Sequence, residues 1–155
     1  MREARSDQRD VDRRAQDARI LDDLQRDFVG VQGRVCDLCQ PAQARFAGAV
    51  SVALGHHMDS IIVNDTATAM NCIRYLKEQR RPARTFLPLD SLQTKVLDES
   101  LRQLGDDVWL ALDVMTFAPS LQRAMHFVVG NALVCTTTLR ARDMVFESRR
   151  AEKGN

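Results

Sequence analysis

A chain of 155 residues can bury one substantial hydrophobic core, so a single domain, or two small lobes that share a core, is expected. Its 22 basic and 21 acidic residues leave a net charge of +1, so nucleic-acid binding would need a local basic patch. Residues 1–27 contain no apolar signal-peptide core, and no window approaches the roughly 20 apolar residues that span a bilayer, which predicts a soluble, unsecreted protein.

Residues 1–27 are rich in arginine and aspartate and lack glycine and proline, which predicts a continuous charged helix. An apolar seam is weak at first and strengthens towards the end, through Ala4, Val11, Ala18, Leu21, Leu24 and Phe28. It covers fewer than the roughly three to four heptads of a well-defined coiled coil. A solvated helix or a frayed terminus therefore stays open as an equal alternative. Gly30 and Gly33 end the helical pattern.

The next residues alternate between strand and helix patterns. Strands are expected at 31–38, 60–63 and 85–87. Pro41 opens the first helix and Gly55 closes it, and Asn64-Asp65 caps the second. The helices are expected to turn inward Phe46, Val50, Ala53 and Leu54, and Ala69, Cys72, Ile73 and Leu76. The order strand, helix, strand, helix, strand implies parallel pairing through helical crossovers, and Pro88 ends the last strand because it cannot donate to a ladder.

The second half repeats part of this order. A strand is expected at 110–115, Pro119 opens a helix that Gly130 closes, and a strand follows at 132–135. A last helix is expected through Leu139, Met144 and Val145. The two halves align at Asp37 with Asp113, Gly55 with Gly130, Val63 with Cys135, and Ala69 with Ala141. This alignment predicts a degenerate duplication of two α/β lobes joined by residues 89–107, although two unrelated strand-helix units could align in the same way.

Cys36 and Cys39 have the CxxC spacing that redox enzymes and zinc sites use. Zinc would need two further ligands, for which the candidates are His56-His57 and Cys72. Pro41 places the expected helix start after Cys39, so no helix N-terminus activates the pair. Ordinary reduced, packed cysteines are favoured, and a small α/β enzyme or a thiol/zinc protein that uses Cys36 and Cys39 stays as the alternative.

Other catalytic patterns are weaker. His126 lies within a predicted helix and has no serine or cysteine at a diagnostic spacing. Gly30 and Gly33 precede a strand, whereas a phosphate-binding loop follows a strand and opens a helix. We therefore expect no catalytic residue, bound cofactor or metal.

Basic residues gather where the second helix meets the strand after it. Lys77, Arg80, Arg81 and Arg84 form this group, which we call the basic cluster, and further basic residues follow at Arg140, Arg142, Arg149, Arg150 and Lys153. The helix dipole explains part of such a pattern, so a solvated basic helix end is the simpler interpretation. If all four residues of the cluster contact phosphates, the slope of log affinity against log salt would be roughly −3 to −4.

Four segments together resemble a known family. They are VQGRVCDLCQPAQARF (31–46), MDSIIVNDTATAMNCIRYLKEQR (58–80), TFLPLD (85–90) and GNALVC (130–135). Their order and spacing are similar to those of the hinge domain of SMC proteins, the chromosome-organising ATPases, most closely in the first SMC subunit of eukaryotic cohesin. The resemblance covers residues 30–147 and implies an α/β fold of two pseudo-repeated lobes preceded by a coiled-coil arm helix.

The resemblance also implies domain boundaries and a role in assembly. Residues 1–29 would be the arm end, 30–106 the first lobe with its connector, and 107–155 a second lobe. The hinge would heterodimerise with the hinge of the other cohesin SMC subunit and close a DNA-entrapping ring on chromosomes in the nucleus. The family's ATPase heads are absent from these residues, so the hinge would not be an enzyme.

The resemblance implies two groups of site residues. Gly30, Gly33 and Arg34 would lie at the partner interface, and the basic cluster would contact DNA weakly. Family hinges continue into a further strand and a glycine-rich segment, whereas this sequence stops at RRAEKGN, so we expect the second lobe and its interface to be incomplete at the C-terminus.

Overall fold

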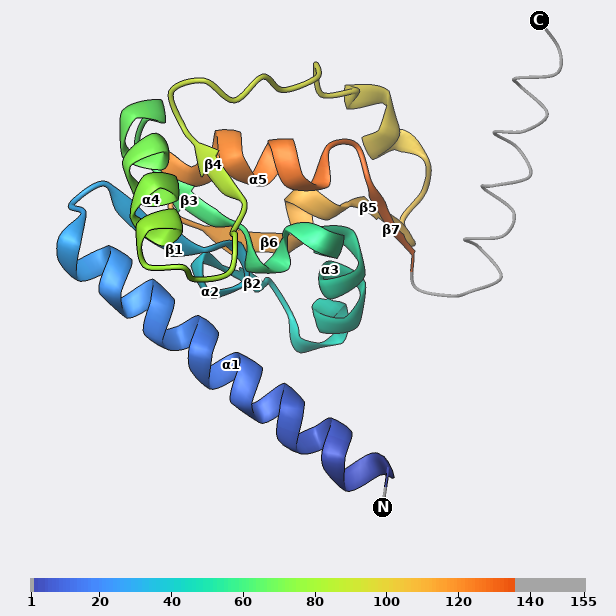
Figure 1. The fold of residues 1–155 in the computed structure, drawn as a ribbon. Helices are drawn as coiled ribbons and strands as arrows, with labels where there is room; N and C mark the ends of the chain where they lie inside the picture. The colour runs from blue at the N-terminus through green and yellow to red at the C-terminus, as the bar shows by residue number, and fades with distance from the viewer. Residues whose placement is uncertain (1, 136–155) are drawn as a thin grey trace, which may run out of the picture. The chain divides into compact units, whose positions relative to one another are not determined.

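The computed structural model describes residues 2–135 (Figure 1). The expected last helix through Leu139, Met144 and Val145 lies outside the described residues, as do the basic residues from Arg140 onward. The chain divides into two compact units. The described part of unit 1 comprises residues 2–38 and 59–92, and that of unit 2 comprises residues 39–58 and 93–135.

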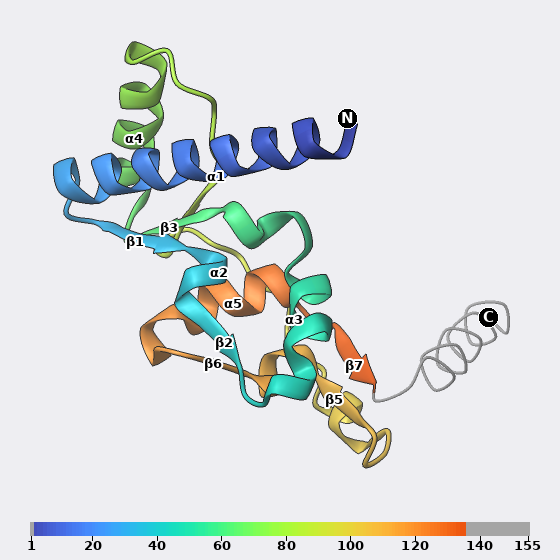
Figure 2. The same ribbon diagram turned by 90° about the horizontal axis from the view of Figure 1, so that it is seen from below.

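Unit 1 combines two longer helices with one small sheet. Its elements are α1 (Arg2–Asp27), β1 (Val31–Arg34), α2 (Val35–Leu38), β3 (Ile61–Val63), α4 (Thr66–Glu78) and β4 (Phe86–Pro88). The strands form a sheet in the order β1-β3-β4. Helix α4 lies beside the C-terminal half of α1 in both ribbon views (Figures 1 and 2).

Local sequence explains α4 well. Asp65 is its N-cap, and the Asp65 carboxylate accepts a hydrogen bond from the Thr68 N–H at 2.7 Å. Ala69, Cys72 and Leu76 then recur at helical spacing and are all buried, as the sequence predicts. The predicted buried strand before this helix is also present, since all three residues of β3 are buried.

The sheet of unit 1 is mixed and not wholly parallel as expected. β3 and β4 are parallel and are joined through α4, with Ile62 opposite Leu87. β1 and β3 are antiparallel, because the segment between them does not form a crossover helix on this sheet; it belongs to unit 2. Pro88 lies within β4 and not after it, opposite Val63, and β4 is an edge strand that tolerates a missing donor.

The described part of unit 2 contains short elements and two two-stranded sheets. Its longer elements are β2 (Cys39–Pro41), α3 (Ala47–Leu54), β5 (Val108–Leu110), β6 (Met115–Phe117), α5 (Gln122–Val129) and β7 (Leu133–Cys135). Single 3₁₀ turns occupy Ala44–Phe46, Gly55–Asp59, Glu99–Gln103, Ala111–Val114 and Pro119–Leu121. β2 pairs with β6 and β5 pairs with β7, both antiparallel. Phe46 packs edge-to-face on Trp109 in the unit's core, with ring centroids 5.1 Å apart.

Three expected elements were wrong in detail. The expected strand at 31–38 ends at Arg34, where the Val35 N–H donates to the Ser60 carbonyl and one helical turn begins. Pro41 lies in β2 and does not open a helix; the helical turns begin at residue 44. The expected strand at 110–115 is likewise interrupted by the 3₁₀ turn Ala111–Val114. Short apolar runs do not reveal by composition where an extended chain turns, which explains the errors at 31–38 and 110–115. Proline is tolerated in an edge strand as well as in a first helical turn, which explains the error at Pro41.

The internal duplication is supported by matching backbone details. β1-α2-β2-α3-β3 has the same order as β5, a 3₁₀ turn, β6, α5 and β7. Gly55 and Gly130 end α3 and α5 with nearly identical angles, φ 55° and ψ −134° against φ 53° and ψ −130°. The bond from Val35 to Ser60 has its counterpart from the Ala111 N–H to the Ala132 carbonyl at 2.8 Å. Such agreement exceeds what two unrelated strand-helix units would share.

The compact units do not coincide with the contiguous parts 1–29, 30–106 and 107–155 suggested by the sequence. Residues 39–58 group with the later segment because β2 pairs with β6 and α3 contacts α5. Helix α1 groups with unit 1 because Ile20 and Leu24 join its hydrophobic core. Contacts between segments distant in the sequence therefore define the units.

Candidate nucleic-acid and partner-interface residues

The basic cluster begins at the C-terminal end of α4. The chain leaves the helix through a Schellman motif, in which the Arg81 N–H donates to the Leu76 carbonyl and the Arg80 N–H donates to the Lys77 carbonyl. The motif requires a left-handed residue, and Arg80 occupies that position with φ 52° where glycine is usual. The turn directs the chain from α4 through Arg81 to Arg84 and β4.

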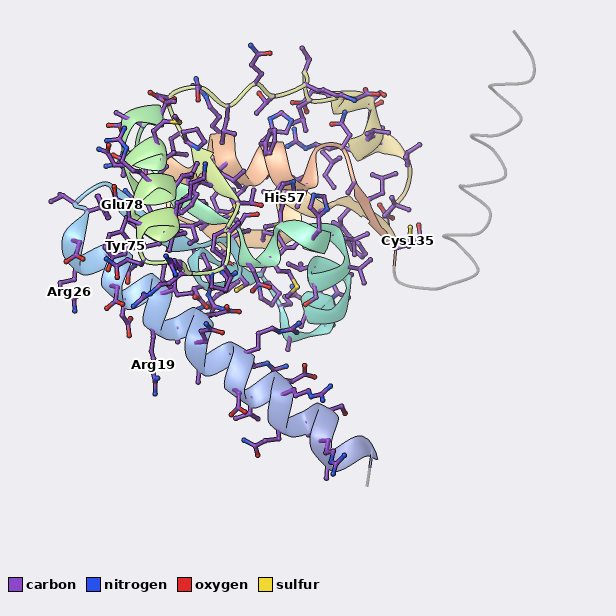
Figure 3. All side chains as sticks on the ribbon, in the orientation of Figure 1. Arg19, Arg26, His57, Tyr75, Glu78 and Cys135 are labelled. Atoms are coloured by element: carbon purple, nitrogen blue, oxygen red, sulfur yellow. The ribbon has the colours of Figure 1, made fainter. Side chains whose placement is uncertain are left out.

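Helix α1 packs beside this turn through its C-terminal half. Ile20 and Leu24 are 2% and 0% exposed and lie in one core with residues of β1, β3 and α4. Phe28 adds an edge contact with Tyr75, with ring centroids 5.7 Å apart. Arg19 is exposed and points away from α4 (Figure 3). The buried seam therefore differs in part from the expected one, since Ala4, Val11 and Ala18 are exposed.

Two arginines of the basic cluster form ion pairs with α1. Arg84 pairs with Asp17, and Arg81 Nη1 lies 2.6 Å from Asp23 Oδ2. All four side chains are at most 30% exposed. The pKa of Asp23 is lowered, mainly by its hydrogen bond with Arg81. Burial opposes this shift, and the charges of Arg81 and Arg26 add to it. Arg81 and Arg84 are thus engaged within unit 1.

Lys77 and Arg80 differ from these two arginines. Both are exposed, and their side chains form no hydrogen bond or ion pair with the described part of the chain. Lys77, Arg81 and Arg84 also line a small hollow of about 70 Å³, whose apolar lining comes from Ile73, Leu76, Ala83 and Phe86. Within unit 1 the four basic residues therefore gather in one region, but only two of them are open to a partner.

The three expected interface residues lie on or beside β1. A Cβ atom on Gly30 would stand 2.7 Å from Thr68 Oγ1, so this glycine permits a close approach of the chain to α4. Gly33 has φ +146° beside an irregularity in the β1–β3 pairing. Arg34 is bonded to Asp37 at 2.9 Å and pairs with Asp59 at 3.6 Å. Gly30 therefore allows the chain to pack closely on α4, and Arg34 forms ion pairs with Asp37 and Asp59 within unit 1.

The cysteine pair does not have the environment of a reactive site. Burial, and then the adjacent Asp37 carboxylate, raises the pKa of Cys36, whereas a reactive thiol needs a lowered one. Burial raises the pKa of Cys72 to about 11. Residues 2–135 contain no group of three or more His, Cys, Asp or Glu side chains arranged to hold a metal ion. The structure therefore lends no support to the thiol or zinc alternative.

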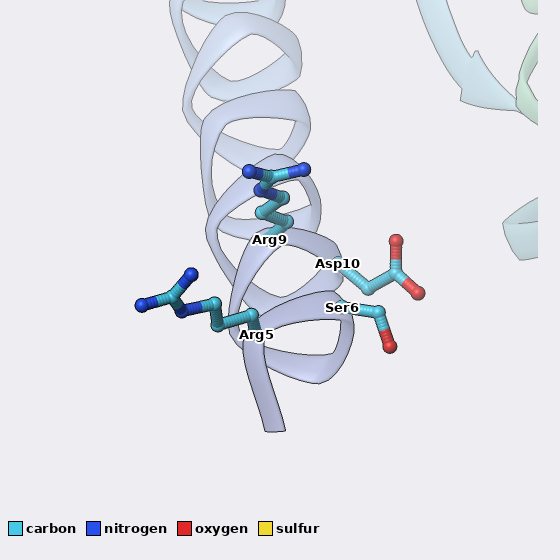
Figure 4. A pocket seen from close by; sticks show the side chains of 4 residues that line it. All are labelled: Arg5, Ser6, Arg9 and Asp10. Carbon is cyan, nitrogen blue, oxygen red and sulfur yellow. The ribbon is translucent and has the colours of Figure 1, made fainter. Parts of the chain in front are cut away.

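His56, His57 and a second hollow, on α1, do not form an alternative site. His57 stacks on His56 and meets Phe127 edge-on, and burial lowers its pKa. A hollow lined by Arg5, Ser6, Arg9 and Asp10 lies on exposed turns of α1, where the side chains point in different directions (Figure 4). None of the helices within residues 2–135 combines the length and the apolar character that a membrane-spanning helix needs.

Sequence reasoning missed the acidic partners of the cluster. Asp17 and Asp23 lie on either side of Ile20, and Asp23 adjoins Leu24, so the spacing of aspartates beside these apolar residues was an available signal. This spacing could not show which basic residues the aspartates pair with, because Asp17 and Arg84 are 67 residues apart in the sequence.

Comparisons with known proteins agree with the resemblance seen in the sequence. The family described as SMC proteins Flexible Hinge Domain matches residues 28–145. Structural maintenance of chromosomes protein 1 of Arabidopsis thaliana is 43% identical over 130 residues, which are 84% of this chain but 11% of that protein.

Solved structures show the same fold. The Pyrococcus furiosus SMC protein hinge domain aligns with a TM-score of 0.68 and 29% identity, covering 79% of this chain and 64% of that one. The structure titled "Folded elbow of cohesin" aligns with a TM-score of 0.72 and 31% identity, covering 90% of this chain and 20% of that one. The chain belongs to the family of SMC protein flexible hinge domains.

Proposed function

We propose that this chain is the dimerisation hinge of a cohesin-type SMC subunit. It joins the hinge of the other cohesin SMC subunit, and the two subunits close a ring that entraps DNA for chromosome cohesion in the nucleus. The observation that carries this proposal is the hinge-family match across residues 28–145, together with 43% identity to a eukaryotic chromosome-maintenance protein. The hinge acts by assembly and not by catalysis.

The sheets offer a physical basis for pairing. In the described part of the chain, β1 is an edge strand of its sheet, and the sheet formed by β5 and β7 has only two strands. An edge strand presents unpaired N–H and carbonyl groups to a strand from another chain. Gly30, Gly33 and Arg34 lie on or next to β1, which supports their assignment to the partner interface.

Contact with DNA is the second part of the proposal. The exposed Lys77 and Arg80 support it, and Arg81 and Arg84 lie beside them in the same unit. Residues 1–29 are proposed as the end of the coiled-coil arm, 30–106 as the first lobe and its connector, and 107–155 as the second lobe.

Light scattering of a mixture with the hinge of the other cohesin SMC subunit tests the pairing. We expect a one-to-one complex at micromolar concentration. Arg34→Glu should weaken this complex, and Arg45→Glu, which makes the same charge change on an exposed arginine of unit 2, should not. Thermal melting confirms that each variant folds. Absence of a complex, both with this chain and with one carrying the further family strand, would contradict the proposal.

A further inference from the structure

The ion pairs between α1 and the basic cluster divide the cluster into two kinds of residue. Arg84 and Arg81 face Asp17 and Asp23, whereas Lys77 and Arg80 are exposed. Neutralisation of phosphates by lysine and arginine determines the salt dependence of DNA binding. A guanidinium group that is already paired with a carboxylate is not available to neutralise a phosphate.

The carboxylates cannot move away easily. Asp17 and Asp23 are six residues apart, about 9 Å along a helix. The buried Ile20 lies between them in the sequence, and the buried Leu24 directly follows Asp23. Both of these apolar side chains belong to the core of unit 1. While that core is intact, α1 therefore holds both carboxylates against the basic cluster.

A phosphate that approached Arg81 or Arg84 would also approach the like-charged carboxylate that is paired with it. Asp17 and Asp23 are only 17% and 20% exposed, so solvent screens them less than it screens a surface carboxylate. With the carboxylates neutral, Lys77, Arg81 and Arg84 would together present three cations around their shared hollow.

We propose that α1 is an internal competitor of DNA, whose Asp17 and Asp23 withhold Arg84 and Arg81 from the phosphate backbone, so that, of the four residues of the basic cluster, only Lys77 and Arg80 bind phosphates while α1 is docked. This inference rests on the proposed DNA contact and not on the hinge pairing. Loss of the two carboxylates adds two phosphate contacts without adding a basic residue.

The test compares two variants of the whole chain that carry the same change in net charge. Asp17→Asn/Asp23→Asn removes the paired carboxylates, and the control Asp12→Asn/Asp22→Asn removes two exposed ones from the same helix. Fluorescence anisotropy with a labelled duplex of mixed sequence gives the slope of log affinity against log salt. The first variant should steepen that slope by about 1.8 relative to the control, since each phosphate contact contributes about 0.9. Between about 50 and about 200 mM salt, its affinity should fall about twelvefold more than that of the control.

Arginine variants supply the second part of the test. In the unaltered chain, Lys77→Gln/Arg80→Gln should flatten the slope by about 1.8, and Arg81→Gln/Arg84→Gln should leave it unchanged. In the Asp17→Asn/Asp23→Asn background, Arg81→Gln/Arg84→Gln should return the slope to that of the control. If circular dichroism shows that the double variant Asp17→Asn/Asp23→Asn does not fold, the single variants Asp17→Asn and Asp23→Asn replace it. Each should steepen the slope of log affinity against log salt by about 0.9.

Three results would overturn the proposal. The first is an equal steepening of the salt slope in the control Asp12→Asn/Asp22→Asn. The second is an equal flattening of the slope by Lys77→Gln/Arg80→Gln and by Arg81→Gln/Arg84→Gln in the unaltered chain. The third is no DNA binding by any variant at low salt. The light-scattering experiment reads hinge pairing independently of DNA, so its failure is distinguishable from failure of this inference.

Discussion

Substitution of Leu24 by alanine tests whether α1 is part of the core of unit 1 or an independent arm helix. Leu24 is fully buried in a cluster that includes Val31, Val63 and Leu76. The change removes three carbon atoms, and at about 0.8 kcal/mol for each buried carbon the lost transfer free energy is about 2.4 kcal/mol. The residual cavity adds to this, so the free energy of unfolding should fall by about 2–5 kcal/mol.

Val11→Ala is the matched control, because Val11 lies on the same helix and is 58% exposed. Its effect should stay within about 0.5 kcal/mol. Urea unfolding, followed by far-UV circular dichroism, measures both variants. If Leu24→Ala destabilises the chain no more than Val11→Ala does, α1 does not contribute to the core and the reasoning is refuted.

Three further predictions concern the neighbourhood of α4. Gly30→Ala should lower the free energy of unfolding by about 1–3 kcal/mol, because its new methyl group meets Thr68 Oγ1. Thr68→Ala in the same chain should restore most of the lost free energy in urea unfolding, and no recovery would contradict the contact. Arg80→Gly should raise the free energy of unfolding by about 1 kcal/mol, since glycine adopts the left-handed angle freely, while DNA binding weakens; destabilisation would refute the strain. Hydrogen bonding by Thr68, first through its side chain and then through its N–H, lowers the pKa of Asp65 below its ordinary value, so the stability that this carboxylate contributes is present above about pH 4 and is lost as pH falls through its folded pKa. Melting temperatures between about pH 5 and about pH 2 should therefore fall less steeply for Asp65→Asn than for the unaltered chain, and equal slopes would contradict the assignment.

Much of the local structure could be predicted because its causes lie close together in the sequence. The N-cap Asp65 and the spacing of Ala69, Cys72 and Leu76 predict α4, and the structure confirms it. The glycines at 55 and 130 end their helices as predicted. Apolar runs at 31–38 and 110–115 were less informative, since their turns depend on hydrogen bonds to the distant Ser60 and Ala132.

The candidate site was predictable only in part. Sequence alone identified Lys77, Arg80, Arg81 and Arg84 as a basic group, and the helix end and strand that carry them were expected. It could not separate the two exposed residues from the two paired ones, because the pairing carboxylates lie on α1, 67 residues before Arg84 in the case of Asp17.

The sequence by itself determined the C-terminal ends of α3 and α5, the N-cap and buried face of α4, the repeated order of elements and the family, because caps, periodicity and motif spacing are local properties of the chain. Tertiary structure decided the antiparallel pairing of β1 with β3, the assignment of residues 39–58 to the second unit, and the docking of α1 through Ile20 and Leu24. It also decided which arginines are occupied. Strand direction and ion pairing depend on which distant surfaces bury each other, and no local pattern specifies that choice.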